Sequence, residues 1–416
     1  MRAVRLRMLG FLGALTFVAP ARASEEMFDR IEQALTGSAY GGQVRARLSG
    51  TLDLEGYRFA LPAPALLQTT ERRLLAPRLS LFLDAQVGAR TYVFAQARVD
   101  RGFDPANRGG QIRLDEYALR FSVRRRGRVQ VQVGKFATVV GNWTARHGSW
   151  ANPFVTAPLV YENLTGIWDT EAVPNSNVLL QWSHVRPGLP ARVTAFEKSL
   201  RVPVAWGPSY ATGAAIAGDI GRWRYALEVK EASLSSRPET WGHEAWSHPT
   251  VSGRIGYQPD ARWNFGLSAS AGSYLRTALH APLPAGRSRG DYRQLVLAHD
   301  LSFAWHHFQW WSELYATRFE IPGVGDAETV AYYAEAKYKF TAQWFGALRW
   351  NRQIFGHIPD RGGRAQWGRN AARADLAAGY RFSAHTQLKL QYNLQQGDTQ
   401  PHRRGELWAA QMTVRF

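Results

Sequence analysis

The sequence contains no cysteine, and beyond its first 23 residues it contains no long apolar run. Without cysteine there are no disulfides, so an exported chain must be held together by other bonds, such as the closed hydrogen-bond ladder of a barrel. No apolar stretch after residue 23 approaches the roughly 18 residues that a helix needs to cross a membrane. If the chain spans a membrane, we therefore expect it to do so with strands.

Acidic residues are also few. The chain has 33 Asp and Glu against 51 Lys and Arg, and its formal net charge is +18. Aromatic residues are abundant instead, with 16 Trp, 16 Tyr and 20 Phe. Basic and aromatic residues together are found in nucleic-acid-binding proteins. An export signal argues against nucleic acid as a partner, and aromatic girdles around a positively lined channel explain the same composition.

The first 23 residues predict that export signal. Three arginines lie among the first seven residues, residues 9–19 are apolar, and Ala21-Arg22-Ala23 is an A-x-A-type cleavage site. The alternative is an uncleaved membrane anchor, but the apolar run is too short for one. We expect a cleaved signal peptide over 1–23 and a mature chain that starts at Ser24 in a Gram-negative bacterium.

The dominant pattern in the rest of the chain is a period of two. Residues 128–133 and 387–395 alternate strictly between polar and apolar, as a strand with one face of each kind does. The pattern predicts an all-β fold, a transmembrane antiparallel β-barrel of 18 strands, or of 16 if the weak stretch 191–220 fails. The predicted strands are 43–52, 75–85, 90–100, 111–123, 128–137, 177–186, 191–199, 211–220, 222–232, 249–258, 261–273, 292–305, 307–318, 328–340, 342–354, 371–383, 386–396 and 405–416.

Short and long links alternate between these strands. The short ones lie near 86–89, 124–127, 187–190, 221, 259–260, 306, 341 and 384–385. The longer ones lie at 53–74, 101–110, 138–176, 200–210, 233–248, 274–291, 319–327, 355–370 and 397–404. Short periplasmic turns and long extracellular loops are typical of outer-membrane barrels. An even strand count closes the sheet without an edge and places both termini on the periplasmic side.

The segment before the first strand is the one helical pattern. Residues 25–36 carry apolar residues at helical spacing, but so short an isolated helix is marginal in water, so a disordered tail is the alternative. The predicted organisation is a signal peptide over 1–23, a periplasmic segment over 24–42 and one barrel over 43–416. No linker divides the barrel.

The alternation also predicts which side chains face the interior. Apolar positions must face lipid, where a charge at mid-depth costs about 2–4 kcal/mol, so the polar positions line the lumen. The inward basic residues are Arg45, Arg47, Arg78, Arg98, Arg120, Arg224, Lys230, Arg254, Lys337, Lys339, Arg349, Arg373, Arg381, Lys389 and Arg415. The inward acidic residues are Asp84, Asp100, Glu116, Glu228, Glu313, Glu335 and Asp375. This excess of base favours anions in the pore. The alternative is that the arginines pair with the acids and only hold the wall together.

The third long link, 138–176, is rich in Trp, Asn, Pro and Tyr and poor in Lys. Such a loop can pack, and the available place is the barrel interior. We expect it to form a constriction with Trp143, Arg146, His147, Trp150, Asn152, Phe154 and Tyr161.

The strand that ends in Gly134-Lys135-Phe136, followed by this loop, resembles the general porin superfamily, most strongly over 111–169. Phosphate-selective-type and related bacterial porins share this arrangement. The resemblance implies a third loop that folds inward, anion binding through arginine and lysine ladders, and a homotrimer. A second resemblance, in the arginine-rich lumen, is to 18-stranded polysaccharide-export barrels.

Catalytic patterns are weak. His147 and Ser149 are two residues apart and would point in opposite directions on an extended segment, so we expect no nucleophile–base pair and no enzyme. His306-His307 lies in a turn, and His243 and His248 lie near Glu244, which gives only a generic metal-binding pattern. We therefore expect neither a metal nor another cofactor.

The sequence thus predicts an outer-membrane porin for passive diffusion of small hydrophilic solutes, with an anion preference. Its expected partners are outer-membrane lipid, small anionic solutes and the barrel-assembly machinery, which reads a C-terminal aromatic such as Phe416. One alternative is an export barrel for an acidic polysaccharide, in which Phe82, Trp311, Tyr315 and Phe345 stack on sugars. The other is a plugged structural or adhesive barrel.

Overall fold

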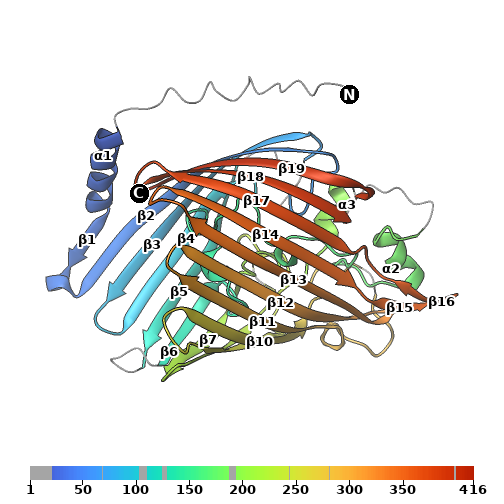
Figure 1. The fold of residues 1–416 in the computed structure, drawn as a ribbon. Helices are drawn as coiled ribbons and strands as arrows, with labels where there is room; N and C mark the ends of the chain where they lie inside the picture. The colour runs from blue at the N-terminus through green and yellow to red at the C-terminus, as the bar shows by residue number, and fades with distance from the viewer. Residues whose placement is uncertain are drawn as a thin grey trace, which may run out of the picture.

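Sixteen strands form one closed antiparallel barrel in the computed structural model, which describes residues 21–67, 69–102, 110–123, 129–186, 194–242, 244–280, 282–397 and 400–416 (Figure 1). Consecutive wall strands pair with each other. The last wall strand closes the barrel on the first, with Leu407 opposite Phe59 and Arg415 opposite Thr51. The barrel therefore has no free sheet edge.

The wall consists of β2 (Val44–Phe59), β3 (Arg73–Val87), β4 (Thr91–Asp100), β5 (Gln111–Ser122), β6 (Val129–Phe136), β7 (Ala211–Ile220), β8 (Trp223–Lys230), β9 (Thr250–Tyr257), β10 (Trp263–Ser273), β11 (Arg293–Trp305), β12 (Phe308–Ile321), β13 (Gly325–Lys339), β14 (Trp344–Phe355), β17 (Ala371–Arg381), β18 (Thr386–Gly397) and β19 (Gln400–Arg415). Sixteen of the predicted strands match these elements, with shifts at their ends.

The prediction of 18 strands was wrong, and the alternative of 16 is confirmed. Predicted strand 177–186 is largely the helix α2 (Ser176–Trp182), and the described end of predicted strand 191–199 lies in α3 (Ala195–Leu200). Side chains at the first positions favour both helices. Asn175 accepts a hydrogen bond from the Val178 amide, and Thr194 forms a capping box with Glu197. The predicted short link 187–190 lies outside the described residues.

The elements outside the wall lie at the two ends of the barrel (Figure 1). The helix α1 (Ala21–Ala34) and the strand β1 (Thr36–Ala39) lie at the end that holds the C terminus, where β1 pairs with the start of β2. The hairpin of β15 (His357–Asp360) and β16 (Gly363–Gln366) lies at the opposite end. No described helix is both long and apolar enough to cross a membrane. Residues 1–20 of the predicted signal peptide lie outside the described residues, and its cleavage stays a prediction.

The end with α1, which we name the short-turn end, carries short connections such as 221–222 and 306–307, and the other end carries most of the long ones. Three predicted long links are shorter than expected. Strands β12 and β13 leave only residues 322–324 between them, β2 and β3 extend into 53–74, and β18 and β19 take up most of 397–404.

Side chains alternate between the two faces of the wall as predicted. On β13, Val330 and Tyr338 are 38% and 47% exposed on the outer face, whereas Glu335 and Lys337 are buried inside. One irregularity breaks this rule on β5. The pairing with β4 shifts between Gln96 and Ala97, which inserts an extra residue at Asp115. As a result, both Asp115 and Arg113 are buried on the inner face.

Candidate functional site

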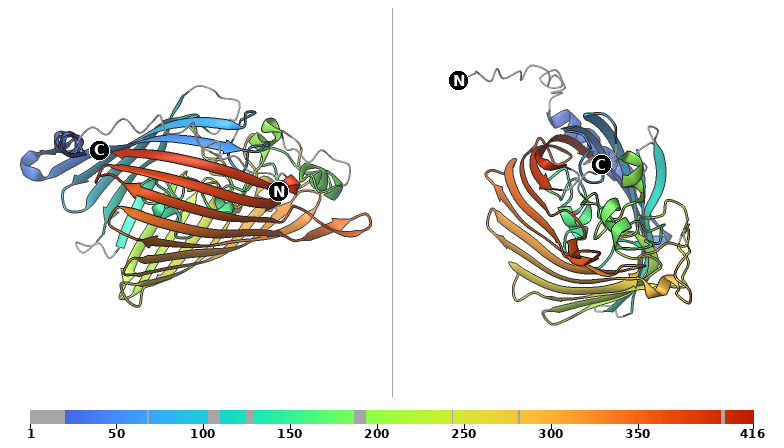
Figure 2. Two further views of the ribbon diagram at one scale, coloured as in Figure 1. Left: turned by 45° about the horizontal axis from the view of Figure 1, so that its top comes forward. Right: turned by 90° about the vertical axis from the view of Figure 1, so that its right-hand side faces the viewer.

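The connection between β6 and β7, which the structure describes over 137–186 and 194–210, is named the inner loop. Its first part lies inside the barrel, and its helices α2 and α3 lie toward the end opposite α1 (Figure 1). Looking along the barrel, its segments lie within the ring of strands (Figure 2). It carries two short 3-10 turns, η3 (Thr144–Arg146) and η4 (Leu159–Tyr161), besides α2 and α3. The inner loop is longer than the predicted loop 138–176, because the two predicted strands that followed it are helices.

Glu313 on β12 holds the first part of the inner loop. Its carboxylate accepts hydrogen bonds from the Asn142 and Trp143 amides and from the Tyr161 hydroxyl, the last at 2.5 Å. The rings of Trp143 and Tyr161 stack with their centroids 4.4 Å apart. Predicted constriction residues and a predicted inward acid therefore meet in one cluster.

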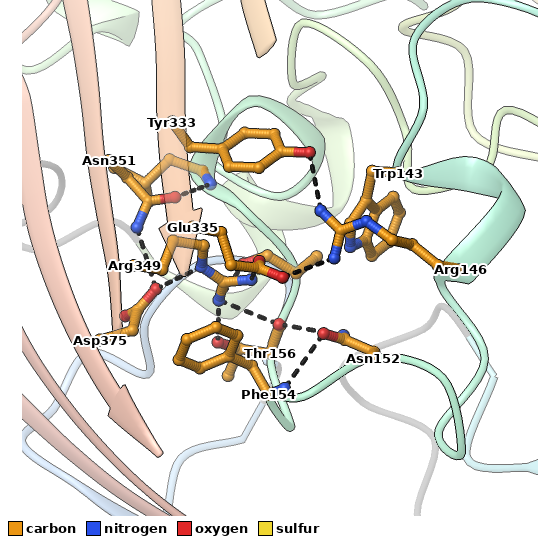
Figure 3. A network of polar contacts seen from close by, with 12 residues as sticks. Trp143, Arg146, Asn152, Phe154, Thr156, Tyr333, Glu335, Arg349, Asn351 and Asp375 are labelled. Carbon is orange, nitrogen blue, oxygen red and sulfur yellow. Dashed lines mark hydrogen bonds and ion pairs between the residues drawn. The ribbon is translucent and has the colours of Figure 1, made fainter. Parts of the chain in front are cut away.

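A chain of ion pairs binds the next part to β13, β14 and β17 (Figure 3). Arg146 of the inner loop pairs with Glu335 at 2.5 Å, and Glu335 also contacts Arg349. Arg349 pairs with Asp375 at 2.7 Å. It also donates to the backbone oxygen of Thr156 in the inner loop. All these charged groups are buried, so their partners must compensate the loss of water.

The end of this network involves Arg373, which pairs with Asp375 at 2.8 Å and with Glu162 of the inner loop. Burial raises the pKa of Glu162, and Arg373 opposes that rise. On the next strand, the Lys389 ammonium donates to the backbone oxygens of Ser149, Asn152 and Phe154 at 2.7 to 3.0 Å. The inner loop is thus fixed to one side of the barrel, from β12 to β18.

A cavity of about 300 Å³ lies on the other side of the inner loop, against the wall from β2 to β5. The residues that line it from the inner loop include Trp143, His147, Ser149, Asn152, Phe154, Tyr161 and Tyr210. Those that line it from the wall include Glu55, Tyr57, Arg78, Arg98, Asp100, Arg113 and Asp115. The predicted constriction would need such a space between a packed loop and a charged wall.

The charges around this cavity balance. The basic lining residues are Arg78, Arg98, Arg101 and Arg113, and the acidic ones are Glu55, Asp100, Asp115 and Glu162. Most of them are paired. Arg78 contacts Asp53 at 3.0 Å and Glu55 at 2.5 Å, while Arg113 contacts Asp100 at 2.6 Å and Asp115 at 2.7 Å. The wall of the cavity is therefore polar without a net charge.

The sequence prediction missed four inward acids, Asp53, Glu55, Asp115 and Asp300, and one inward base, Arg113. Asp53 and Glu55 were assigned to a link because β2 is longer than predicted. The bulge on β5 reverses the alternation that would have exposed Asp115 and Arg113. Near Asp300, apolar residues occupy both faces of β11, so a period of two could not show which face is inward.

Four bases at the short-turn end have no acidic partner among the described residues. We name this group, Lys337, Lys339, Arg381 and Arg415, the basic mouth. The guanidinium carbons of Arg381 and Arg415 lie 5.2 and 4.2 Å from the ring centre of Trp150, a residue of the inner loop. Here the predicted excess of positive charge is present, outside the constriction.

The remaining predicted basic residues line neither the cavity nor the basic mouth. Arg254 pairs with Asp300 at 2.7 Å, Arg224 with Asp219 at 3.5 Å, and Arg47 with Glu32 of α1. Two further members of the predicted set lie on strands near the short-turn end. They are Arg120, which donates to Gln132, and Arg45 near the start of β2.

His147 bonds to Tyr210 and not to Ser149. Its Nδ1 lies 2.5 Å from the Thr144 carbonyl oxygen and its Nε2 lies 2.8 Å from the Tyr210 hydroxyl. Burial lowers the pKa of His147, which favours the neutral ring, and a neutral ring can form both bonds by donating from Nδ1 and accepting at Nε2. No bond joins His147 to Ser149 among the described contacts. The prediction that the protein is not an enzyme stays a prediction.

The histidines that the sequence analysis considered as generic metal ligands do not form a metal site in the described contacts. Glu244 bonds to Arg276 at 2.8 Å and to Thr277 at 2.7 Å, while His243 lies outside the described residues. His306 occupies a tight turn between β11 and β12 with a positive φ of 49°.

Comparison with known proteins shows what this fold is similar to. No protein-family model and no curated protein sequence matches the chain. The outer membrane channel DcaP of Acinetobacter baumannii has a TM-score of 0.57 and 11% identity, and the alignment covers 92% of this chain and all of that one. The anion-selective porin from Comamonas acidovorans has a TM-score of 0.53 and 10% identity, covering 90% of this chain and 100% of that one. OmpT of Vibrio cholerae in its trimer form has a TM-score of 0.53 and 8% identity, covering 90% and 99%. The fold is therefore that of bacterial outer-membrane porins.

Proposed function

We propose that this protein is an outer-membrane porin through which small hydrophilic solutes diffuse passively. The observation that carries the proposal is the inner loop, which is bound to one side of a closed barrel and leaves a charged cavity against the other. Solutes would pass between Trp143 and Tyr210 of the inner loop on one side and Arg78 and Arg98 of the wall on the other. Such passage needs neither a cofactor nor a reaction.

The anion preference is proposed to arise at the basic mouth. At the constriction Arg78, Arg98 and Arg113 each pair with an acid, so little net potential remains there. At the mouth, four unpaired cations lie inside low-dielectric walls that focus their field and concentrate anions. The similarity in fold to a porin described as anion-selective agrees with this proposal. The phosphate-selective subtype suggested by the sequence has no support beyond that resemblance.

The location, partners and assembly of the protein are proposed from its sequence and its fold. The signal peptide, the periplasmic position of both termini and the contact with outer-membrane lipid stay predictions. So does recognition of Phe416 by the barrel-assembly machinery. A homotrimer is proposed because porins of this fold include a trimeric form.

Planar-bilayer recordings of the purified mature protein test the proposal. We expect step-like channel openings and, in a KCl gradient, a reversal potential of the sign that anion permeation produces. Cation preference would contradict the proposed anion preference but would still support a channel. Absence of any opening would contradict the channel and favour the plugged barrel.

An export barrel for an acidic polysaccharide has less support. Three of the four aromatics proposed to stack on sugars are covered by other groups. Arg146 lies over Trp311, Lys337 lies over Phe345, and Tyr315 bonds to Tyr161. These rings are not available to a passing chain while the inner loop is in place.

A further inference from the structure

A cluster of three potential metal ligands joins α1 to the rim of the barrel. It consists of Asp29 and Glu32 on α1 and His385 in the turn between β17 and β18. One ligand atom from each lies within 4.8 Å of the others. The two carboxylates are three residues apart, which places them on one face of the helix. Neither the pore nor its selectivity involves this cluster.

The hydrogen bonds of His385 orient its ring toward the carboxylates. Nδ1 lies 3.0 Å from the backbone oxygen of Arg415, which can only accept, so Nδ1 carries the hydrogen. Metal-binding histidines are commonly oriented by such a bond from the other ring nitrogen to a backbone carbonyl. The ring of Phe28 stacks on the imidazole with centroids 5.4 Å apart. His385 is buried, with 5% of its surface exposed.

This orientation leaves Nε2 facing the Asp29 Oδ1 atom at a distance of 3.0 Å. In a neutral imidazole this nitrogen is an acceptor, and a carboxylate oxygen is an acceptor too. Two acceptors so close need a positive species between or beside them, either a proton on Nε2 or a metal ion. Ligand atoms of a tetrahedral zinc ion, bound at about 2.0–2.2 Å, lie roughly 3.4 Å apart. The observed 3.0 Å is slightly shorter than this spacing, so a small outward movement of the exposed Asp29 side chain would admit the ion.

We propose that Asp29, Glu32 and His385 bind a divalent transition-metal ion of the Zn²⁺ type that fastens α1 to the barrel rim. Imidazole with two carboxylates is a ligand set for zinc rather than for calcium or magnesium, which prefer oxygen alone. Three protein ligands leave a fourth position for water. Arg47 pairs with one oxygen of Glu32, which leaves the other oxygen for the ion. The other nearby cation, the Arg415 guanidinium, donates to the Ala384 carbonyl oxygen.

Titration of the full mature protein in detergent with Co²⁺, followed by visible absorption, and with Zn²⁺, followed by calorimetry, tests the proposal. We expect one ion per chain, and binding more than tenfold weaker in His385→Gln and in Asp29→Asn. Glu26→Gln is the matched control on α1, because Glu26 pairs with Arg30 at 3.8 Å and is not one of the three ligands of the cluster. Binding in this variant should equal that of the wild type.

Two further measurements separate the proposal from simpler explanations. The double variant His306→Gln/His307→Gln removes the exposed turn histidines, and it should bind as the wild type does. Hydrogen exchange should show that Zn²⁺ protects the amides of α1 in the wild type but not in His385→Gln. No uptake of either ion would overturn the proposal and leave Asp29 and His385 as a protonated ion pair. Uptake that persists in His385→Gln would overturn it as well.

Discussion

At the scale of single residues, the molecule is governed by buried charges that have partners. Arg349 is the central example, since its guanidinium contacts Glu335, Asp375 and the backbone of the inner loop at once. Sequence alternation predicted that Arg349, Glu335 and Asp375 point inward. It could not predict that they meet, because partners on neighbouring strands depend on register, and Arg146 comes from a loop.

Arg349→Met should destabilise the barrel by about 3–5 kcal/mol, because Glu335 and Asp375 would be left buried without their shared cation. Unfolding in urea, followed by tryptophan fluorescence, measures the change. The same variant should open more often or more widely in bilayers, because the contact with Thr156 is lost. Arg349→Lys keeps the positive charge and should lose less stability than Arg349→Met. Wild-type stability in Arg349→Met would mean that the network does not hold the inner loop.

A second residue-scale prediction concerns His147. Its pKa is lowered by burial from an unfolded value of about 6.5, so the contribution of its neutral form is present above that value and is lost as the pH falls below it. Protonation reverses the bond to Tyr210, because Nε2 must then donate to the hydroxyl oxygen, and it places a charge in a buried site. Lowering the pH from 8 to 5 should therefore increase hydrogen exchange around residues 143–152 more in the wild type than in His147→Gln. An equal increase in both proteins would assign the effect to other groups.

At the scale of elements, the sequence predicted the wall well and the inner loop poorly. A period of two repeats along most of the wall strands, and all sixteen of them were among the eighteen that it predicted. The segment 176–200 carries short apolar runs that fit a strand or a helix equally, and only the capping by Asn175 and Thr194 distinguishes them. The bulge on β5 leaves no clear mark in the sequence, so the two side chains that it turns inward were missed.

The junction of the first and last wall strands gives a prediction at this scale. The Gly50 and Phe416 backbones exchange hydrogen bonds of 2.8 and 3.0 Å, and the Phe416 ring lies directly over Gly50. A Cβ atom at Gly50 would lie 2.5 Å from the ring. Gly50→Val should displace the ring and lower the fraction of chains that fold into vesicles, seen as a heat-modifiable band on gels.

Gly56→Val is the matched control for this experiment. It lies on the same strand and the same face, and a Cβ atom there meets nothing within 4 Å. Equal folding of the two valine variants would indicate that the position of the Phe416 ring does not matter for assembly.

At the scale of the whole molecule, charge is separated along the barrel. Pairs of opposite charge line the constriction, and unpaired bases gather at the short-turn end. A net charge of +18 in the sequence suggests an anion channel but not where its selectivity lies. The proposed location depends on strand register and on Trp150 of the inner loop, whose ring lies near both Arg381 and Arg415.

The double variant Arg381→Gln/Arg415→Gln tests this separation. One unit charge about 10 Å from a permeating anion changes its energy by about 0.4 kcal/mol in water, which is a factor of about two. Each removed charge halves anion entry and doubles cation entry, so we expect the anion-to-cation permeability ratio to fall by about 16-fold for the two charges at low salt. The fall should be smaller at high salt, because salt screens the charges. Reversal potentials measure the ratio. The control Arg58→Gln/Arg352→Gln removes the same charge from the outer face, where the ratio should not change. An unchanged ratio in the first variant would place selectivity elsewhere.

The path of the inner loop has one more consequence. The chain leaves the wall at Phe136 and returns to it at Ala211, and these two residues are direct partners on adjacent strands. The whole insertion therefore begins and ends at a single point of the wall, and no other strand depends on its length. It is a cassette. A different segment could be exchanged between Phe136 and Ala211 while the strands stay paired, provided that it supplies new partners to buried wall charges such as Glu313, Arg349 and Lys389. Solute preference could then be engineered without changing the pairing of the wall strands.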